Sequence, residues 1–312
     1  MTTNHKKYFA KILLFGEYTL LKGSKALSIP FERFGGRLEC QAENSVVKEN
    51  SNKRIRDFYK YLKKSKPDFP KGLNFEMDRF ESDLDHGLYL NSDIPEGYGM
   101  GSSGVLVAAV YEKYAINPAN PELNLDLGSL KNNFSFMESY FHGKSSGIDP
   151  LTSFIRKPLL ISSPEKIETL DFSIEKNLKN SNAFLVDTGI HAQTGGHVRN
   201  FLEKTGSSKY EKILESGIMP RNNNCIDLII NEGRGNFLNE VRKLSALQLE
   251  YFQEMIPGNF ITLWERGIES GDYFFKLCGS GGGGFILGFT EDYKRADEIF
   301  REQGIKAQKI FE

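Results

Sequence analysis

The feature that most constrains the fold is a glycine- and serine-rich segment, Pro-Glu-Gly-Tyr-Gly-Met-Gly-Ser-Ser-Gly at residues 95–104. It lies between a predicted strand at residues 87–94 and a predicted apolar helix at residues 105–115, which is apolar nearly all round and should be buried. Glycines let the backbone turn several N–H groups toward one point, and the following helix adds the positive end of its dipole. The segment therefore predicts a site for an anion such as a nucleotide phosphate. The plain alternative is that Ser102 or Ser103 is only a helix N-cap.

Shorter matches to nucleotide-binding fingerprints occur at residues 99–104, 143–145 and 279–284. The matches at 99–104 and 279–284 lack the strand and helix context of the dinucleotide fingerprint. The match at 143–145 lacks the leading glycine of the Walker loop, because Glu138 stands in its place. We interpret all three as chance matches.

Length and composition limit the classes of protein that remain. The 312 residues suit two domains of roughly 150 residues each, predicted at 1–180 and 181–312. Forty Lys and Arg almost balance 41 Asp and Glu, which argues against nucleic acid or an acidic membrane as a partner. No apolar run approaches the roughly 20 residues of a membrane span, and the start lacks a secretory signal pattern, so a cytoplasmic location is expected. Three widely spaced cysteines argue against a disulfide scaffold or a zinc site.

The pattern of apolar residues predicts a mixed α+β fold. The first hundred residues indicate mostly strands, at 12–15, 38–47 and 87–94, interrupted by one helix at 52–64. Apolar residues at alternating spacings of three and four predict a helix from Leu127 to Phe141 that ends at Gly143. After residue 180 the pattern predicts a strand at 184–186 and helices at 225–231 and 237–255. The end of the chain predicts a strand at 273–277, a glycine run, a strand at 285–289, a helix at 291–303 and a short strand near 310, which suggests a split βαβ unit.

Two further clusters carry candidate functional residues. Glu138 lies near the end of the predicted helix, and Asp149 lies in the turn-rich segment Ser-Ser-Gly-Ile-Asp-Pro at 145–150. The ordinary alternatives are a solvated surface carboxylate for Glu138 and a turn aspartate for Asp149. Four consecutive glycines at 281–284 follow Lys276 between two strands. Because such a run costs conformational entropy, it implies a close approach of the backbone to something, although a plain flexible loop is also open.

Taken in order, these clusters resemble the motifs of the GHMP kinases. The segment Lys-Ile-Leu-Leu-Phe-Gly-Glu-Tyr at 11–18 resembles the first motif, G-K-x-x-L-x-G-E-H/Y. Residues 95–104 resemble the second motif, P-x-G-x-G-L-G-S-S-A, and residues 276–284 resemble the third, K-x-x-G-x-G-x-G-G. The resemblance implies a two-domain α+β fold, with a mixed N-terminal domain and a ferredoxin-like split βαβ C-terminal domain.

The resemblance also implies a role for each candidate residue in transfer of the γ-phosphoryl group of ATP. Asp149 would accept the proton of the substrate hydroxyl, Lys11 would keep that carboxylate ionised, and Ser103 and Glu138 would hold Mg²⁺. The residues that would contact ATP are Pro95, Gly97, Gly99, Gly101, Ser102, Ser103 and Gly104. Those that would reach toward the substrate are Glu17, Tyr18, Ser146, Thr194, Gly281 and Gly282.

Within the family, the segment from Glu138 to Asp149 is most similar to the mevalonate kinases. The resemblance implies a small-molecule substrate, mevalonate, with phosphomevalonate as the alternative, and it leaves a homodimer open. The chain departs from the pattern at Tyr18, Gly104 and Pro150, where a histidine, an alanine and an asparagine are usual. Tyr18 is shared with many phosphomevalonate kinases, so it bears on the substrate.

Two other classes are weighed against this interpretation. A non-catalytic sensor of a nucleotide or metabolite needs neither a base nor a metal site, so the joint presence of Asp149, Ser103 and Glu138 argues against it. The related diphosphomevalonate decarboxylase is disfavoured by the metal-ligand glutamate and by the Ser-Gly-Ile-Asp context.

Overall fold

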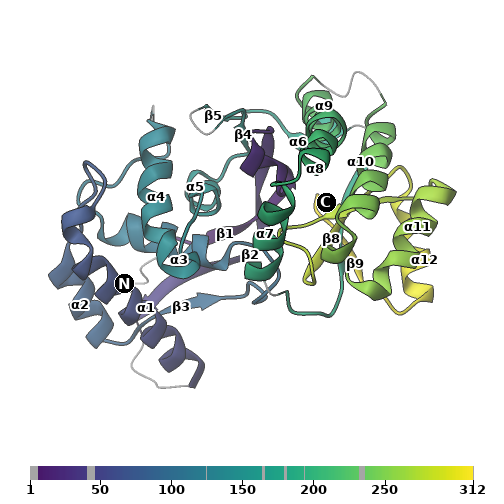
Figure 1. The fold of residues 1–312 in the computed structure, drawn as a ribbon. Helices are drawn as coiled ribbons and strands as arrows, with labels where there is room; N and C mark the ends of the chain where they lie inside the picture. The colour runs from purple at the N-terminus through teal and green to yellow at the C-terminus, as the bar shows by residue number, and fades with distance from the viewer. Residues whose placement is uncertain are drawn as a thin grey trace. The chain divides into compact units, whose positions relative to one another are not determined.

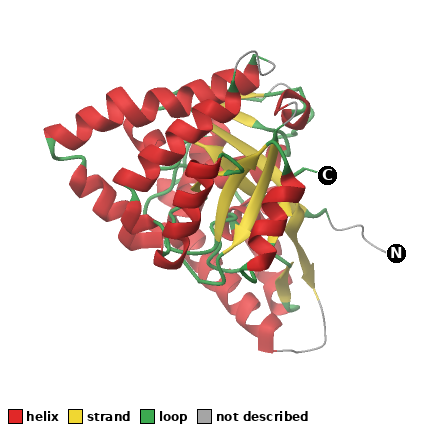
Figure 2. Cartoon of the chain, turned by 90° about the vertical axis from the view of Figure 1, so that its right-hand side faces the viewer, coloured by secondary structure: helices red, strands yellow, loops and turns green. Residues whose placement is uncertain are grey.

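The computed structural model describes residues 6–40, 46–123, 125–163, 166–178, 181–192, 194–231 and 236–311. It mixes helices with two sheets, as the α+β prediction requires (Figure 2). The strands are β1 (Tyr8–Phe15), β2 (Ala26–Cys40), β3 (Leu88–Ser92), β4 (Leu159–Ile161), β5 (Ile167–Thr169), β6 (Asn182–Asp187), β7 (Phe274–Leu277), β8 (Phe285–Thr290) and β9 (Ala307–Lys309). The α-helices are α1 (Val46–Lys64), α2 (Met77–Asp85), α3 (Ser102–Tyr114), α4 (Leu127–His142), α5 (Ile148–Ile155), α6 (Ile174–Leu178), α7 (Thr194–Lys204), α8 (Ser208–Ile213), α9 (Met219–Ile230), α10 (Phe237–Tyr251), α11 (Ile261–Ser270) and α12 (Tyr293–Glu302). Single turns of other helix types are η1 (Thr19–Lys22), η2 (Lys66–Asp68), η3 (Leu214–Ile218), η4 (Gln253–Met255) and η5 (Gly258–Phe260).

Contacts divide the chain into two compact units that are interleaved along the sequence. The first unit comprises Met1–Lys11, Ile29–Pro95 and Met100–Lys157, and the second comprises Ile12–Ser28, Glu96–Gly99 and Pro158–Glu312. The contiguous boundary expected at residue 180 stays a prediction.

The core of the first unit forms where α3, α4 and α5 lie together (Figure 1). Small and branched apolar side chains line α3, and nearly all of this helix is buried, as its sequence predicts. Tyr111 of α3, Phe134 of α4 and Phe154 of α5 join the three helices, with ring centroids 5.0 to 5.5 Å apart in edge-to-face geometry. This packing fixes the relative positions of the first residues of α3 and α5.

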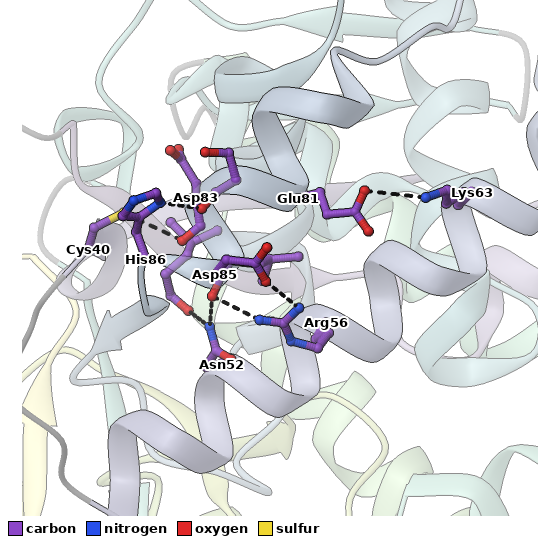
Figure 3. Close-up of polar contacts among 11 residues, drawn as sticks. Cys40, Asn52, Arg56, Lys63, Glu81, Asp83, Asp85 and His86 are labelled. Carbon is purple, nitrogen blue, oxygen red and sulfur yellow. Dashed lines mark hydrogen bonds and ion pairs between the residues drawn. The ribbon is translucent and has the colours of Figure 1, made fainter.

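Polar side chains of α1 hold the carboxyl end of α2 (Figure 3). Asn52 donates to the carbonyls of Leu84 and Leu88, and Arg56 donates to the carbonyl of Leu84 and pairs with Asp85 at 3.0 Å. The last carbonyls of a helix have no partner within the helix, so these donors satisfy groups that would otherwise need water. The network therefore attaches α2 to α1.

The second unit contains the sheet β7-β8-β6-β9, whose neighbouring strands are all antiparallel. The predicted order of strand, glycine run, strand, helix and strand is confirmed as β7, residues 281–284, β8, α12 and β9. Phe184, Phe275 and Phe300 pack their rings together between the sheet and α12. The core thus rests on aromatic contacts.

Comparison with the sequence pattern shows good agreement for the long helices and two errors among the first hundred residues. The helices predicted at 52–64, 105–115 and 127–141 are α1, α3 and α4, and Gly143 ends α4 at φ 72°. The prediction of mostly strands in the first hundred residues is wrong at α2, where Phe80 and Leu84 supply only one apolar pair on a short helix. The strand expected to reach residue 47 ends at Cys40; residues 41–45 lie outside the described part, and Val46 begins α1.

No helix in the described part of the chain is both long and apolar enough to cross a membrane.

Candidate active site

The first half of the candidate site is an ion pair between the first motif and α5. Lys11 lies on β1, where its backbone N–H donates to the carbonyl of Met100 at 3.0 Å. Its side chain is only 8% exposed, and its Nζ lies 3.1 Å from Oδ1 of Asp149, which is 33% exposed. A buried ammonium thus faces a carboxylate that is open to solvent on one side.

The end of the glycine-serine loop (residues 95–104) lies beside this ion pair. Gly101 precedes α3 in the left-handed conformation, with φ 76°. A Cβ added to Gly101 would lie 3.0 Å from Cγ of Lys11 and 3.4 Å from Oδ2 of Asp149. The N-terminus of α3, where backbone N–H groups are unsatisfied within the helix, therefore adjoins the Lys11–Asp149 pair.

Ser103 and Glu138 form the second half of the site. The Ser103 hydroxyl donates to Oε1 of Glu138 at 3.0 Å, and the hydroxyl of Ser145 donates to the other carboxylate oxygen. Glu138 is 3% exposed, and Ser103 is buried as well. Burial, followed by the nearby charge of Asp149, raises the pKa of Glu138 to about 7, against the lowering effect of the two serine hydroxyls and Lys11.

Close packing of α3 on α5 brings Asp149 to this place. Asp149 is the second residue of α5, which begins after Gly147 in the left-handed conformation. A Cβ added to Gly104 would lie 2.8 Å from both the carbonyl carbon of Asp149 and the nitrogen of Pro150. The glycine at 104, where the family pattern has alanine, therefore permits an approach of helix backbones that a methyl group would obstruct.

His142 is a member of the cluster that the sequence analysis missed. It is the last residue of α4, one turn after Glu138, and its Nε2 lies 3.0 Å from the Ser103 hydroxyl oxygen. Although its side chain is exposed, desolvation lowers the pKa of the imidazole, so the neutral ring is favoured near pH 7. The spacing of four between Glu138 and His142 was the available signal, because it places both side chains on one helix face.

In the second unit, the predicted substrate residues of the first motif contact the third motif. Glu17 forms an ion pair with Lys276, 2.6 Å from Oε2 to Nζ, and both side chains are at most 2% exposed. The hydroxyl of Tyr18 donates to the carbonyl of Ser280 at 2.5 Å. Burial raises the pKa of Tyr18, whose ring packs against Phe201 and Phe252.

The glycine run (residues 281–284) does approach other atoms closely, as expected. A Cβ added to Gly281 would lie 2.3 Å from the carbonyl oxygen of Met255, and one added to Gly282 would lie 2.3 Å from Nε2 of His197. The N–H of Gly282 donates to the Met255 carbonyl at 2.6 Å. The run is therefore packed against the chain's own backbone and side chains, which rules out a plain flexible loop.

The remaining predicted residues are spread over both units. Gly97 and Gly99 have φ of 75° and 69° in the second unit, where Gly97 accepts a hydrogen bond from the N–H of Ala192 at 3.0 Å. Ser146 is exposed. Ser102 begins α3 and is partly exposed, as is Pro95, the last residue of its segment of the first unit. Thr194 begins α7, and its side chain lies outside the described part.

The Ser103–Glu138 pair suits a magnesium ion. Two oxygens bound side by side to one Mg²⁺ at about 2.1 Å in octahedral geometry lie about 3.0 Å apart. This is the separation of the Ser103 hydroxyl and Oε1 of Glu138. A hydroxyl and one carboxylate also match the preference of this ion for oxygen ligands and for keeping several waters.

Family models match both halves of the chain. The model described as GHMP kinases N terminal domain matches residues 55–157, and the model described as GHMP kinases C terminal matches residues 228–303. Together they cover more than half of the sequence. The chain belongs to the GHMP kinases, a class of phosphotransferases.

Relatives include a curated phosphomevalonate kinase and solved structures of a mevalonate kinase and a phosphomevalonate kinase. The chain is 25% identical over 325 residues to a phosphomevalonate kinase of Saccharolobus solfataricus, covering 95% of this chain and 93% of the relative. The mevalonate kinase structure of Methanococcus jannaschii matches with a TM-score of 0.64 at 17% identity, covering 99% and 98% of the two chains. The Streptococcus pneumoniae phosphomevalonate kinase structure, which holds phosphomevalonate and AMPPNP, matches with a TM-score of 0.62 at 15% identity, covering 97% and 99%.

Proposed function

We propose that the chain transfers the γ-phosphoryl group of ATP to the hydroxyl of a small metabolite, with Mg²⁺ as the cofactor. The observation that carries the proposal is the Lys11–Asp149 ion pair beside the buried Ser103–Glu138 pair at the start of α3. Phosphoryl transfer needs positioned phosphates, neutralised charge and an oriented hydroxyl, and it needs little covalent chemistry from the protein.

The residues divide these tasks between them. The N-terminus of α3 and the glycine-serine loop offer N–H donors and a positive dipole to the phosphates. Asp149 accepts the proton of the acceptor hydroxyl, and Lys11 orients the Asp149 carboxylate through the 3.1 Å ion pair. Ser103 and Glu138 would hold the magnesium ion, which would neutralise charge on the transferred phosphoryl group.

Mevalonate is the proposed acceptor. A phosphorylated acceptor brings a dianion that clustered Lys or Arg side chains would have to match. The two lysines near Tyr18 are already paired with carboxylates: Lys22 lies 2.8 Å from Glu211, and Lys25 lies 2.5 Å from Asp227. Lys276 likewise faces Glu17, so these three cations are neutralised by the protein itself.

Phosphomevalonate is the second candidate. It is favoured by the full-length similarity to a phosphomevalonate kinase and by Tyr18, which stands where mevalonate kinases have histidine. Opening of the surface pairs of Lys22 and Lys25 would release two cations at small cost, because such pairs contribute only about 0 to 1 kcal/mol.

Steady-state assays with both acceptors at equal concentration, with ATP and Mg²⁺, test the proposal. We expect the larger kcat/KM with mevalonate, and almost no turnover with either acceptor in Asp149→Asn. A larger kcat/KM with phosphomevalonate would reverse the choice of acceptor and leave the kinase assignment intact. Absence of turnover with both acceptors, together with tight ATP binding, would instead favour a sensor.

A further inference from the structure

We propose that His142 is a positioning residue that sets the direction of the Ser103 hydroxyl toward the magnesium ion. The inference rests on the proposed function and extends it to a residue with no assigned role. It starts from the two contacts of Ser103: Oε1 of Glu138 and Nε2 of His142, each 3.0 Å from the same hydroxyl oxygen.

A serine hydroxyl has one proton and two lone pairs, so its two partners compete for the proton. Without a cation, the hydroxyl donates to the Glu138 carboxylate, and its oxygen can accept from the imidazole in the tautomer that carries the proton on Nε2. A cation held by both oxygens requires that each of them turn a lone pair toward it. The serine proton must then point away from the ion and away from the oxygen of Glu138 that binds it.

His142 is placed to accept that proton. In the neutral ring, the tautomer with its proton on Nδ1 leaves Nε2 as an acceptor facing Ser103. The ring belongs to the last residue of α4, and its centroid lies 6.5 Å from that of Phe141. Hydrogen bonds of this kind, made by a ligand to a neighbouring residue, orient the ligand and are worth about 10- to 100-fold in metal affinity.

The test measures binding of Mn²⁺ with ADP, in the absence of acceptor, by the loss of the free Mn²⁺ signal in electron paramagnetic resonance. We expect His142→Ala to raise the dissociation constant of Mn²⁺ about tenfold. His142→Gln retains an amide oxygen as acceptor and should stay within about threefold of the wild type. His86→Ala is the matched control, because this histidine is exposed at the end of α2, where its Nδ1 lies 2.7 Å from the carbonyl oxygen of Ser82.

Two further variants separate the possible failures. In a Ser103→Ala background, His142→Ala should cause no additional loss; a further tenfold loss there would mean that His142 does not act through Ser103. If Mn²⁺ binds normally to His142→Ala but much more weakly to Glu138→Gln, the role of His142 is overturned and the proposed magnesium site stands. If Glu138→Gln also binds Mn²⁺ normally, the proposed magnesium site itself fails.

Discussion

Replacement of Gly104 by alanine tests whether packing of α3 on α5 sets the position of Asp149. The added Cβ would lie 2.8 Å from the backbone of Asp149 and Pro150 and 3.0 Å from Cβ of Asp149. Ordinary carbon contacts are about 3.5 to 4.0 Å, so α5 has to move by about 0.7 to 1.2 Å, because neither backbone atom can rotate away.

Two effects on stability oppose each other in this variant. Alanine is favoured over glycine in a helix by up to about 1 kcal/mol. Overpacking of a close helix contact costs about 1 to 3 kcal/mol. We therefore expect a net loss of about 0 to 2 kcal/mol in the free energy of unfolding, small enough for the protein to stay folded.

The effect on catalysis should be larger than the effect on stability. A displacement of about 1 Å at a reacting group can cost about 100-fold in rate. We expect kcat of Gly104→Ala to fall 10- to 100-fold at saturating ATP and acceptor, while urea denaturation shows a folded protein. Gly217→Ala is the control, since its Cβ would meet nothing closer than 3.9 Å. If Gly104→Ala keeps kcat within twofold of the wild type, the contact of α3 with α5 does not position the base.

Five other outcomes are expected. Asp149→Asn should keep ATP affinity and lower kcat by roughly 10²- to 10⁴-fold, because a positioned general base usually contributes this much to the rate; a loss under about threefold in rapid-quench assays would mean that Asp149 is not the base. Ser103→Ala and Glu138→Gln should each raise the Mg²⁺ concentration for half activity, and the double variant should be much less than additive, whereas full additivity would assign them to separate functions. Because the pKa of Glu138 is raised from 4.5 to about 7, its proton competes with the cation, so the Mg²⁺ requirement should fall as pH rises from 6 to 8 and should lose this dependence in Glu138→Gln. The raised pKa means that the folded state favours the protonated form of Glu138. The stability that this protonated group contributes should be full below about pH 4.5 and should be lost as pH rises toward 7. Urea titrations across this range will check the change in the free energy of unfolding. Tyr18→Phe should lower the free energy of unfolding by about 1 kcal/mol through loss of the hydrogen bond to Ser280; an unchanged urea midpoint would contradict that contact.

Much of the fold follows from local patterns in the sequence. The buried apolar character of α3 and the spacing of apolar residues in α4 predict both helices, because each pattern reflects a single environment along a whole helix. The short helix α2 was not predicted. Its attachment depends on hydrogen bonds from Asn52 and Arg56 of α1, and no local sequence pattern reveals contacts with another helix.

The candidate site was predictable only in part. Motif order identified Lys11, Ser103, Glu138 and Asp149, which the structure brings together in the first unit. The second partner of Ser103 on α4, His142, was not predicted, because a histidine one turn after a glutamate is common on solvent-facing helices. The close neighbours of the glycine run could not be predicted either, because they come from segments distant in sequence.

The Glu17–Lys276 ion pair has a consequence for how the chain is made. Its two residues are 259 positions apart, and the carboxylate is fully buried in the finished protein. During synthesis at about 5 to 20 residues per second, Glu17 waits roughly 13 to 50 seconds before Lys276 leaves the ribosome. A buried carboxylate without its cation is strongly unfavourable, so the segment around Glu17 has to stay hydrated until then. A chain that ends before Lys276 therefore lacks the cation that this carboxylate needs in order to be buried in its charged form.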